Sequence, residues 1–202
     1  MLEDTYLKNA MIPERYQEEI ELIPSERDEQ TFFELNNIRN NIKDFVDSGK
    51  NLLICSNGVG NGKTTWSVKL LKAYIKSVGK VGFTNSTPGL FINVNSFLNE
   101  KKLAITDPTI AEKIRQTEKN ILSAKLVVFD DIADKSLSEY DINMMYYWLD
   151  YRTANLKSCI FTTNQLPEQL KKSLNAKVYS RVVNYSIVKY ITGRDHRGES
   201  GC

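Results

Sequence analysis

The sequence has little cysteine and almost no histidine. It contains three cysteines and one histidine, His196, and no two cysteines form a Cys-x-x-Cys pair. A structural zinc site needs closely spaced Cys or His ligands, and a disulfide framework needs an even set of cysteines. Cys55 and Cys159 lie inside apolar runs, whereas Cys202 is at the terminus, and this distribution suits a reducing compartment. The composition argues against a zinc protein and against a disulfide-stabilised secreted domain.

A long apolar segment is also missing. The acidic start of the chain, residues 1–4, is not followed by an apolar stretch, and no run approaches the roughly 20 residues that would span a bilayer. The 202 residues suffice for one α/β domain that buries about 70% of its unfolded surface. We therefore expect a soluble, cytoplasmic protein with no membrane partner.

The net charge is only +2, but the charges are unevenly placed. Acidic residues cluster early in the chain: Glu14, Glu18, Glu19, Glu21, Glu26, Asp28 and Glu29. Basic residues cluster late: Lys171, Lys172, Lys177, Arg181, Lys189, Arg194 and Arg197. This asymmetry fits an anionic partner for the C-terminal part, and it fits two ordinary solvated faces equally well.

A phosphate-binding loop is the clearest motif. Residues 56–65 read Ser-Asn-Gly-Val-Gly-Asn-Gly-Lys-Thr-Thr, between an apolar run and a helical pattern that begins at Lys63. Such a loop points successive N–H groups at an anion, the helix N-terminus adds its dipole, and the lysine reaches the outer phosphates. The predicted nucleotide-binding residues are Asn57, Gly58, Val59, Gly60, Asn61, Gly62, Lys63, Thr64 and Thr65.

One position departs from the usual Gly-x-x-x-x-Gly-Lys-[Ser/Thr] spacing, because Asn57 replaces the first glycine. Asn tolerates positive φ better than most residues, so we expect it to adopt a glycine-like conformation. The alternative, a hairpin turn at Asn57-Gly58, does not account for Gly-Lys-Thr at a helix start.

Strand and helix patterns alternate along the rest of the chain. Strands are predicted over 52–55, 90–94, 126–131 and 159–163. Helices are predicted over 31–46, over 63–79, over 96–123 as a pair divided at Asp107-Pro108, and from a capping box at Ser138 to Arg152. This alternation predicts a three-layer α/β fold with a parallel sheet between helices. Residues 1–30 are predicted to be an N-terminal arm with one short helix, and 31–202 the ATPase domain.

Three polar residues stand at predicted strand ends. Asp130 and Asp131 follow a fully apolar run, and Asn164 follows another. In a parallel sheet such ends share one edge, where ligands bind. Asp130 and the Thr64 hydroxyl are therefore predicted to hold Mg²⁺, Asp131 to orient or deprotonate a water, and Asn164 to bond the terminal phosphate. ATP and Mg²⁺ are the expected ligands.

Several segments together resemble the AAA+ ATPases that load bacterial replicative helicases, the DnaC/DnaI type; the transposon helper ATPases of the IstB type are close relatives. The segments are 57–65, 127–131, 160–164, Val178-Tyr179-Ser180-Arg181 and Gly193-Arg194-Asp195-His196-Arg197. Ile12-Pro13-Glu14-Arg15-Tyr16 resembles the entry segment of that family. The resemblance implies a P-loop fold of the AAA+/ASCE type with a reduced or absent C-terminal lid.

The resemblance also implies residue roles. Arg181 would be an arginine finger for a neighbouring copy, a role worth roughly 10³ to 10⁵ in rate where it has been measured. Without the resemblance, Arg181 would be interpreted as a surface residue of a basic helix. The family likeness further suggests phosphate sensors at Arg152, Arg194 and Arg197, and single-stranded DNA contacts at Lys101 and Lys102.

The expected function is an ATP-driven replication accessory protein that self-associates through Arg181, binds single-stranded DNA, and recruits or loads a replicative helicase. Hydrolysis is expected to be slow, since Asp131 is one methylene shorter than the glutamate of many ATPases and a misplacement of about 1 Å can cost about 10² in rate. The alternatives are a non-hydrolysing switch that blocks a host helicase loader, an IstB-like transposition helper, and a small-molecule or nucleotide kinase.

Overall fold

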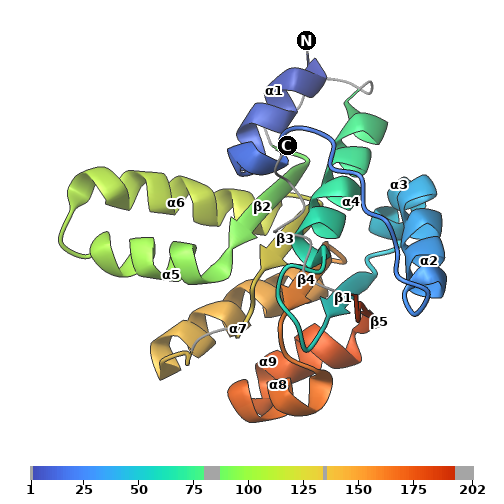
Figure 1. Cartoon of the computed structure of the whole chain (residues 1–202). Coiled ribbons are helices and arrows are strands. Elements are labelled where there is room, and N and C mark those ends of the chain that lie inside the picture. Colours follow the sequence, from blue (N-terminus) through green and yellow to red (C-terminus); the bar gives the residue numbers. More distant parts are fainter. Residues whose placement is uncertain (1, 80–86, 134–135, 194–202) are drawn as a thin grey trace.

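The core of the protein is a five-stranded parallel sheet with the order β2-β3-β4-β1-β5 (Figure 1). The computed structural model describes residues 2–79, 87–133 and 136–193. The strands are β1 (Asn51–Cys55), β2 (Gly89–Asn93), β3 (Leu126–Asp130), β4 (Ser158–Thr163) and β5 (Ser186–Tyr190). β1 pairs with β4 on one side and β5 on the other, so the loop that follows β1 leaves the carboxyl edge of the sheet between these two strands.

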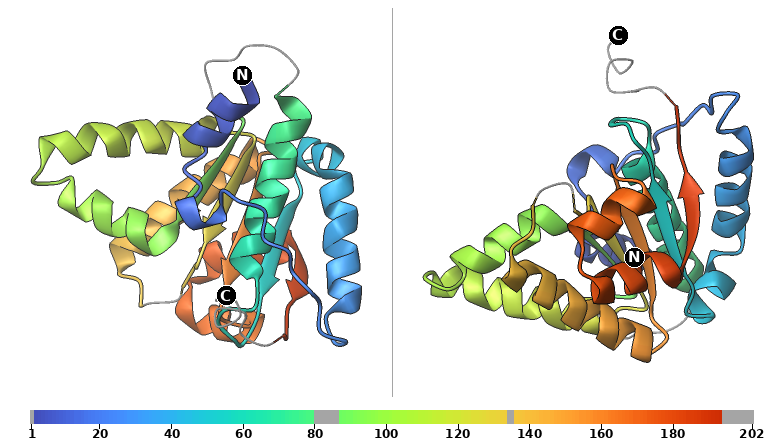
Figure 2. Two further views of the ribbon diagram at one scale, coloured as in Figure 1. Left: turned by 45° about the horizontal axis from the view of Figure 1, so that its top comes forward. Right: turned by 90° about the horizontal axis from the view of Figure 1, so that it is seen from below.

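Helices cover both faces of the sheet, as the two views of Figure 2 show. One face carries α1 (Leu2–Asn9), the 3-10 turn η1 (Glu14–Tyr16), α2 (Glu29–Asn40), α3 (Ile42–Asp47) and α4 (Lys63–Val78). The other carries α5 (Val94–Leu103), α6 (Pro108–Ser123), α7 (Glu139–Ala154), α8 (Pro167–Ser173), α9 (Ala176–Tyr179) and the π-helical turn η2 (Ser180–Asn184). The predicted three-layer α/β fold is confirmed.

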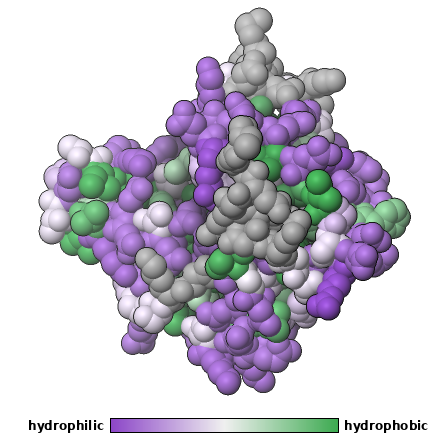
Figure 3. Space-filling model, in the orientation of Figure 1, coloured by the Kyte–Doolittle hydropathy of each residue, from purple (hydrophilic) through white to green (hydrophobic). Residues whose placement is uncertain are grey.

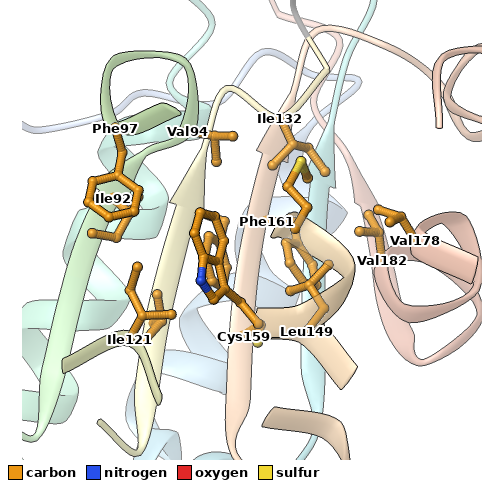
Figure 4. Close-up of a cluster of buried hydrophobic side chains, with 14 of the residues drawn as sticks. Ile92, Val94, Phe97, Ile121, Ile132, Leu149, Cys159, Phe161, Val178 and Val182 are labelled. Carbon is orange, nitrogen blue, oxygen red and sulfur yellow. The ribbon is translucent and has the colours of Figure 1, made fainter. Parts of the chain in front are cut away.

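Apolar residues of the strands alternate between two cores. In β3, Val127 and Phe129 pack with the α5–α9 layer, whereas Leu126 and Val128 pack with the α1–α4 layer. Figure 4 shows side chains of the first core, among them Phe161 of β4. Phe161 stacks on Phe129 of β3 with ring centroids 5.8 Å apart. Burial on both faces explains why the central strands are unbroken apolar runs.

The predicted single helix over 31–46 is wrong. Asn41, at φ −114° and ψ 28°, separates α2 from α3, and its backbone N–H and side-chain amide both donate to the carbonyl of Asn37. An asparagine can satisfy the last carbonyls of a helix in this way and so end it. Helical periodicity continues across the break, which is why the pattern alone suggested one helix.

The N-terminal segment packs onto the sheet and α4. Tyr6, Ala10, Ile12 and Tyr16 are buried in the same core as α4, and Phe91 of β2 donates its N–H to the Ala10 carbonyl at 2.8 Å. The apolar residues of this arm thus dock on the chain itself. The division of the chain at residue 30 stays a prediction.

The α5–α6 pair forms a hairpin that projects from the body (Figure 1). Two ion pairs join its helices, Lys101–Glu118 at 2.8 Å and Lys113–Glu100 at 2.9 Å. Leu103 and Ile105 at its far end are 58% and 76% exposed, and apolar surface is visible over this end in Figure 3. Residues 191–193, the described part after β5, form no helix, and the prediction of a reduced or absent C-terminal lid concerns residues beyond them.

Among the described residues, no helix combines the length and the apolar composition that a membrane span requires.

Candidate nucleotide site

The loop between β1 and α4 is shaped by its two last glycines. Gly60 and Gly62 have φ of 71° and 92°, in the left-handed region that favours glycine. Asn57 is not among the residues with positive φ, so the expectation that it imitates glycine is wrong. The physical reason lies in Ser56, whose hydroxyl accepts the Gly58 N–H at 2.7 Å and forms a turn that needs no left-handed residue at Asn57.

Lys63 lies inside this loop. Its ammonium donates to the Gly58 carbonyl at 2.7 Å and to Oδ1 of Asn61 at 2.9 Å, and the residue is 5% exposed. Asn61 is also buried, and its amide nitrogen donates to the Ser56 hydroxyl and to the Ile191 carbonyl at 3.2 Å. Asn61 therefore connects the lysine to the end of β5, a role that the loop motif alone did not indicate.

The acid pair at the end of β3 is fastened to β4 by one hydroxyl. Thr162 donates its Oγ1–H to Oδ1 of Asp130 at 2.7 Å and accepts the N–H of Asp131 at 3.0 Å. Asp131 has φ 56°, so the chain turns sharply there, and its Oδ2 lies 3.5 Å from the amide nitrogen of Asn93. Thr162 is thus a positioning residue for both acids.

A cavity of about 500 Å³ lies where the loop and the strand ends meet. The predicted site residues that line it are Gly60, Asn61, Gly62, Lys63, Thr64, Thr65, Asp131 and Asn164. The cavity lining does not include Asn57, Gly58, Val59 or Asp130, although all four belong to the same loop and strand ends. Val59 is 52% exposed, while Asp130, next in sequence to the cavity-lining Asp131, is 3% exposed.

The other wall of the cavity comes from the N-terminal segment. Arg15, Tyr16, Ile20 and Leu22 line it, and Leu22 carbons lie 3.1 Å from where a Cβ on Gly62 would be. In the sequence, residues 12–16 stood out only through their resemblance to the entry segment of the family. That resemblance did not indicate that the segment lies beside the loop between β1 and α4. This apolar and aromatic wall is suited to a nucleotide base, since such pockets combine a few polar groups with apolar lining.

Thr64 and Asp130 offer the oxygen ligands that Mg²⁺ prefers. Asp130 is held by Thr162 on one oxygen, and Thr64 is a half-buried residue of the cavity lining. Within the described ranges no group of three His, Cys, Asp or Glu residues is placed to hold a metal. The residues present fit an ion that arrives with substrate phosphates, whose charge it would neutralise when bound.

Cys55 ends β1 directly before the loop. Burial raises the pKa of its thiol to about 12, and the positive charge of Lys63 lowers that pKa by a smaller amount. At neutral pH the thiol is protonated, so Cys55 is a packing residue rather than a nucleophile.

Arg181 is not part of this cavity lining. It lies in η2, in the opposite helical layer from α4, and its guanidinium donates to Oδ1 of Asp150 at 2.7 Å. The Tyr146 and Tyr185 rings lie 5.9 Å and 5.5 Å from it, and the hydrogen bond to Asp150 raises the pKa of Arg181. An arginine held in this way is pre-oriented, and its role toward a neighbouring copy stays a prediction.

The suggestion that Arg152 is a phosphate sensor is wrong. The side chain is 0% exposed and donates to the carbonyls of Ile121, Ala124, Lys125 and Ser158, at 2.6 to 3.3 Å. The Ile121 and Ala124 carbonyls lie at the end of α6, and those of Lys125 and Ser158 lie at the starts of β3 and β4, the edge of the sheet opposite to the cavity. Arg152 instead ties α6 and α7 to the amino ends of two strands.

We expect Arg152→Ala to destabilise the fold by roughly 3 to 5 kcal/mol, because it leaves several buried carbonyls without donors. The midpoint of urea unfolding, followed by circular dichroism, measures this. Arg115→Ala on α6 removes an exposed ion pair with Glu112 and is the matched control, with an expected effect below about 1 kcal/mol. Equal effects of the two substitutions would contradict the structural role of Arg152.

The other suggested basic contacts are only partly described. Lys101 is paired with Glu118, and Lys102 with Asp141 at 2.8 Å, so both lysines have partners within the chain. Asp141 belongs to the capping box of α7, which makes Lys102 a link between two helices. Arg194 and Arg197 lie outside the described residues.

Solved structures of replication proteins share this fold. The DnaC helicase loader matches with a TM-score of 0.70 and 21% identity, over 89% of this chain and 99% of that one. DnaI matches with a TM-score of 0.68 and 19% identity, over 93% and 95% of the two chains. The replication initiator DnaA bound to AMPPCP and single-stranded DNA matches at 0.65 and 16%, over 91% of this chain and about half, 52%, of its own.

No protein-family model and no curated protein sequence matches the chain. At identities of 16% to 21% the likeness concerns the fold. The likeness to DnaC over almost the whole of both chains confirms the P-loop fold, with a parallel sheet between helices, that the sequence resemblance predicted.

Proposed function

We propose that the chain is an ATP-binding AAA+ accessory protein of DNA replication, which binds single-stranded DNA and recruits or loads a replicative helicase. The observation that carries the ATP-binding part is the single cavity that brings together Lys63, Asp131 and Asn164 from three separate segments. The fold shared with DnaC, DnaI and DnaA supports the replication role. ATP hydrolysis is proposed to be coupled to contacts between copies.

Each residue of the cavity has its own role in ATP binding or hydrolysis. The loop N–H groups and the N-terminus of α4 bind the phosphates, and Lys63 leaves its carbonyl partner Gly58 for the outer phosphate oxygens. Thr64 and Asp130 would hold Mg²⁺, which would neutralise charge on the phosphates. Asp131 orients the attacking water and accepts its proton, and Asn164 hydrogen-bonds the terminal phosphate without adding negative charge. The wall at Tyr16 and Leu22 receives the base.

The helicase part of the proposal is tested by capture. The tagged chain, saturated with ATP, should retain a replicative DNA helicase from lysate of its host, identified by mass spectrometry. Lys63→Ala should lose that capture. Equal capture by both chains would separate helicase binding from the nucleotide site, and capture of no helicase in either state would overturn this part of the proposal.

We expect Asp131→Asn to bind ATP like the unmodified protein and to hydrolyse it about 10² to 10⁴ times more slowly, because an amide cannot accept the proton. Nucleotide released from denatured complex after a single turnover should be ATP for the variant and ADP for the unmodified protein. Asp47→Asn, on the exposed surface of α3, is the control.

The same measurement decides the main alternative, a nucleotide switch that blocks a host helicase loader without hydrolysis. Its supporting observation is that the Asp131 carboxylate is short and lies against the Asn93 amide. If unmodified protein also returns only ATP, the switch replaces the ATPase.

A further inference from the structure

One short segment forms a wall of the nucleotide cavity and also borders a second groove. Residues 16–22, here called the wall segment, contribute Tyr16, Ile20 and Leu22 to the cavity lining. Tyr16 and Ile20 also line a neighbouring groove of about 690 Å³ that runs along α4. In the left view of Figure 2 this part of the chain is the blue trace that passes in front of α4. The position of the wall segment therefore sets the shape of the nucleotide cavity.

The wall segment has little structure of its own. Between η1 and α2 the chain forms no helix or strand. Among the described residues, no backbone–backbone hydrogen bond involves residues 18–24. Ile20 and Leu22 are only partly buried where they pack against the α1–α4 core. A segment with few buried apolar contacts and no backbone hydrogen bonds opens easily unless another part of the protein holds it.

Lys72 of α4 holds the start of this segment. Its ammonium donates to the carbonyls of Tyr16 at 2.5 Å and Gln17 at 2.6 Å, with a longer bond of 3.4 Å to the Glu18 carbonyl. The side chain is half-buried, and hydrogen bonds from a charged donor are stronger than those between neutral groups. Three successive carbonyls thus share one cation.

Lys72 does not itself reach the nucleotide cavity. It lines the groove and is not part of the cavity lining, so it can act on a nucleotide only through the wall segment. The helix that carries it begins at Lys63 of the phosphate loop and continues to Val78. One helix therefore supports both halves of the site, the phosphate loop at its N-terminus and the base wall through Lys72.

We propose that Lys72 is a positioning residue for the base of the bound nucleotide. Its bonds to the wall segment hold Tyr16, Ile20 and Leu22 in place before the nucleotide arrives, so binding does not have to order them. Phosphate binding by the loop and the N-terminus of α4 does not depend on these bonds. The inference rests on the proposed nucleotide site and adds the residue that shapes its base wall.

Attraction between charged side chains is the competing explanation for the position of the wall segment. Burial lowers the pKa of Lys69 and of Lys72, and the negative charge of Glu19 opposes that shift at each. Both lysines are thus within electrostatic reach of the segment. They differ in their contacts, because Lys72 donates to the carbonyls whereas the Lys69 ammonium lies 5.6 Å from the centre of the Trp66 ring. Removing each charge in turn separates the two explanations.

Lys72→Met removes the ammonium and keeps an unbranched side chain. Isothermal titration calorimetry with Mg²⁺ should show the Kd of ATP rising about tenfold or more, while the Kd of inorganic tripolyphosphate, which has no base, changes less than about twofold. A tenfold change equals about 1.4 kcal/mol. Lys69→Met and Lys76→Met on the same helix lose the same charge and are the matched controls, with ATP affinity expected within about twofold of the unmodified protein.

Limited digestion with a protease that cleaves after glutamate gives an independent measurement. Cleavage requires the wall segment to leave α4, so cuts after Glu18, Glu19 and Glu21 should appear several times faster in Lys72→Met than in the unmodified protein or in either control. Equal rates of cleavage in all four proteins would contradict the tether.

The remaining outcomes are distinct. An unchanged ATP Kd in Lys72→Met, an equal rise for tripolyphosphate, or an equal loss in Lys69→Met would overturn the inference. If Lys72→Met does not fold, Lys72→Gln, whose shorter neutral side chain reaches fewer carbonyls, is measured with the same expected direction. An unmodified protein that binds ATP no more tightly than tripolyphosphate would remove the base wall and this inference but keep the phosphate loop. One that binds neither would overturn the nucleotide site itself, and the inference with it.

Discussion

Arg181→Ala should lower ATP turnover by about 10³-fold or more, while ATP affinity stays nearly unchanged. The reason is geometric: the guanidinium lies away from the cavity lining of its own chain, so it can stabilise transition-state charge only in a neighbouring copy. Steady-state turnover and equilibrium binding of labelled ATP measure the two effects. The ion pair with Asp150 is partly exposed, with 25% and 45% of the two side chains accessible, so its loss should cost less than about 1 kcal/mol in stability.

Mixing two inactive variants distinguishes a finger in trans from a structural arginine. Arg181→Ala has an intact cavity, and Lys63→Ala has an intact Arg181. If Arg181 acts on the neighbour, the mixture regains turnover at cavities of the first variant that receive the guanidinium of the second. Arg181→Lys keeps the charge but loses the planar fork, and should recover only part of the rate. A mixture as inactive as its components, with association intact, would contradict the role.

The parts of the fold that the sequence predicted are those with a local signal. β1, β3 and β4 are buried on both faces, so each is a continuous apolar run that a pattern detects. β5 was missed because it is an edge strand. Its residues, Ser-Ile-Val-Lys-Tyr, are half-buried or exposed, and it leaves no comparable apolar run. The phosphate loop was predictable because its chemistry requires fixed residue types at fixed spacing.

Errors arose where the partner of a side chain is distant in sequence. In the sequence, Arg152 looks like an ordinary surface residue in the last turn of a helix. In the structure it is buried, and it donates hydrogen bonds to carbonyls at the end of α6 and at the starts of two strands. The cavity wall at Tyr16 and Leu22 likewise depends on a segment about 40 residues before the loop, a separation that periodicity cannot bridge. The prediction for Asn57 failed because the Ser56 hydroxyl accepts the Gly58 N–H and forms the turn. The spacing of the glycines gives no information about that hydrogen bond.

Lys63→Ala should abolish the stabilisation that ATP gives the protein. With Mg²⁺ and ATP at about 100 times the dissociation constant, the unmodified chain should gain about 2.7 kcal/mol, which for a domain of this size raises the melting temperature by roughly 5 to 10 °C. The ammonium is the point charge of the loop, and in the free protein it is already directed to the loop carbonyl of Gly58. Removing it leaves the phosphates with backbone donors alone, so the variant should show almost no shift.

A second lysine of the same helix makes this prediction specific. Lys76 lies on the exposed surface of α4 and is not part of the nucleotide cavity lining, so Lys76→Ala should keep the full shift. In Lys63→Ala the Gly58 carbonyl still accepts from the Ser56 hydroxyl, whereas Oδ1 of Asn61 loses its lysine donor, so the melting temperature without nucleotide should fall only modestly. If the shift survives in Lys63→Ala, ATP binds elsewhere; if the unmodified protein shows none, the phosphate loop is not a nucleotide site and the roles of Asp131, Asn164 and Arg181 lose their common premise.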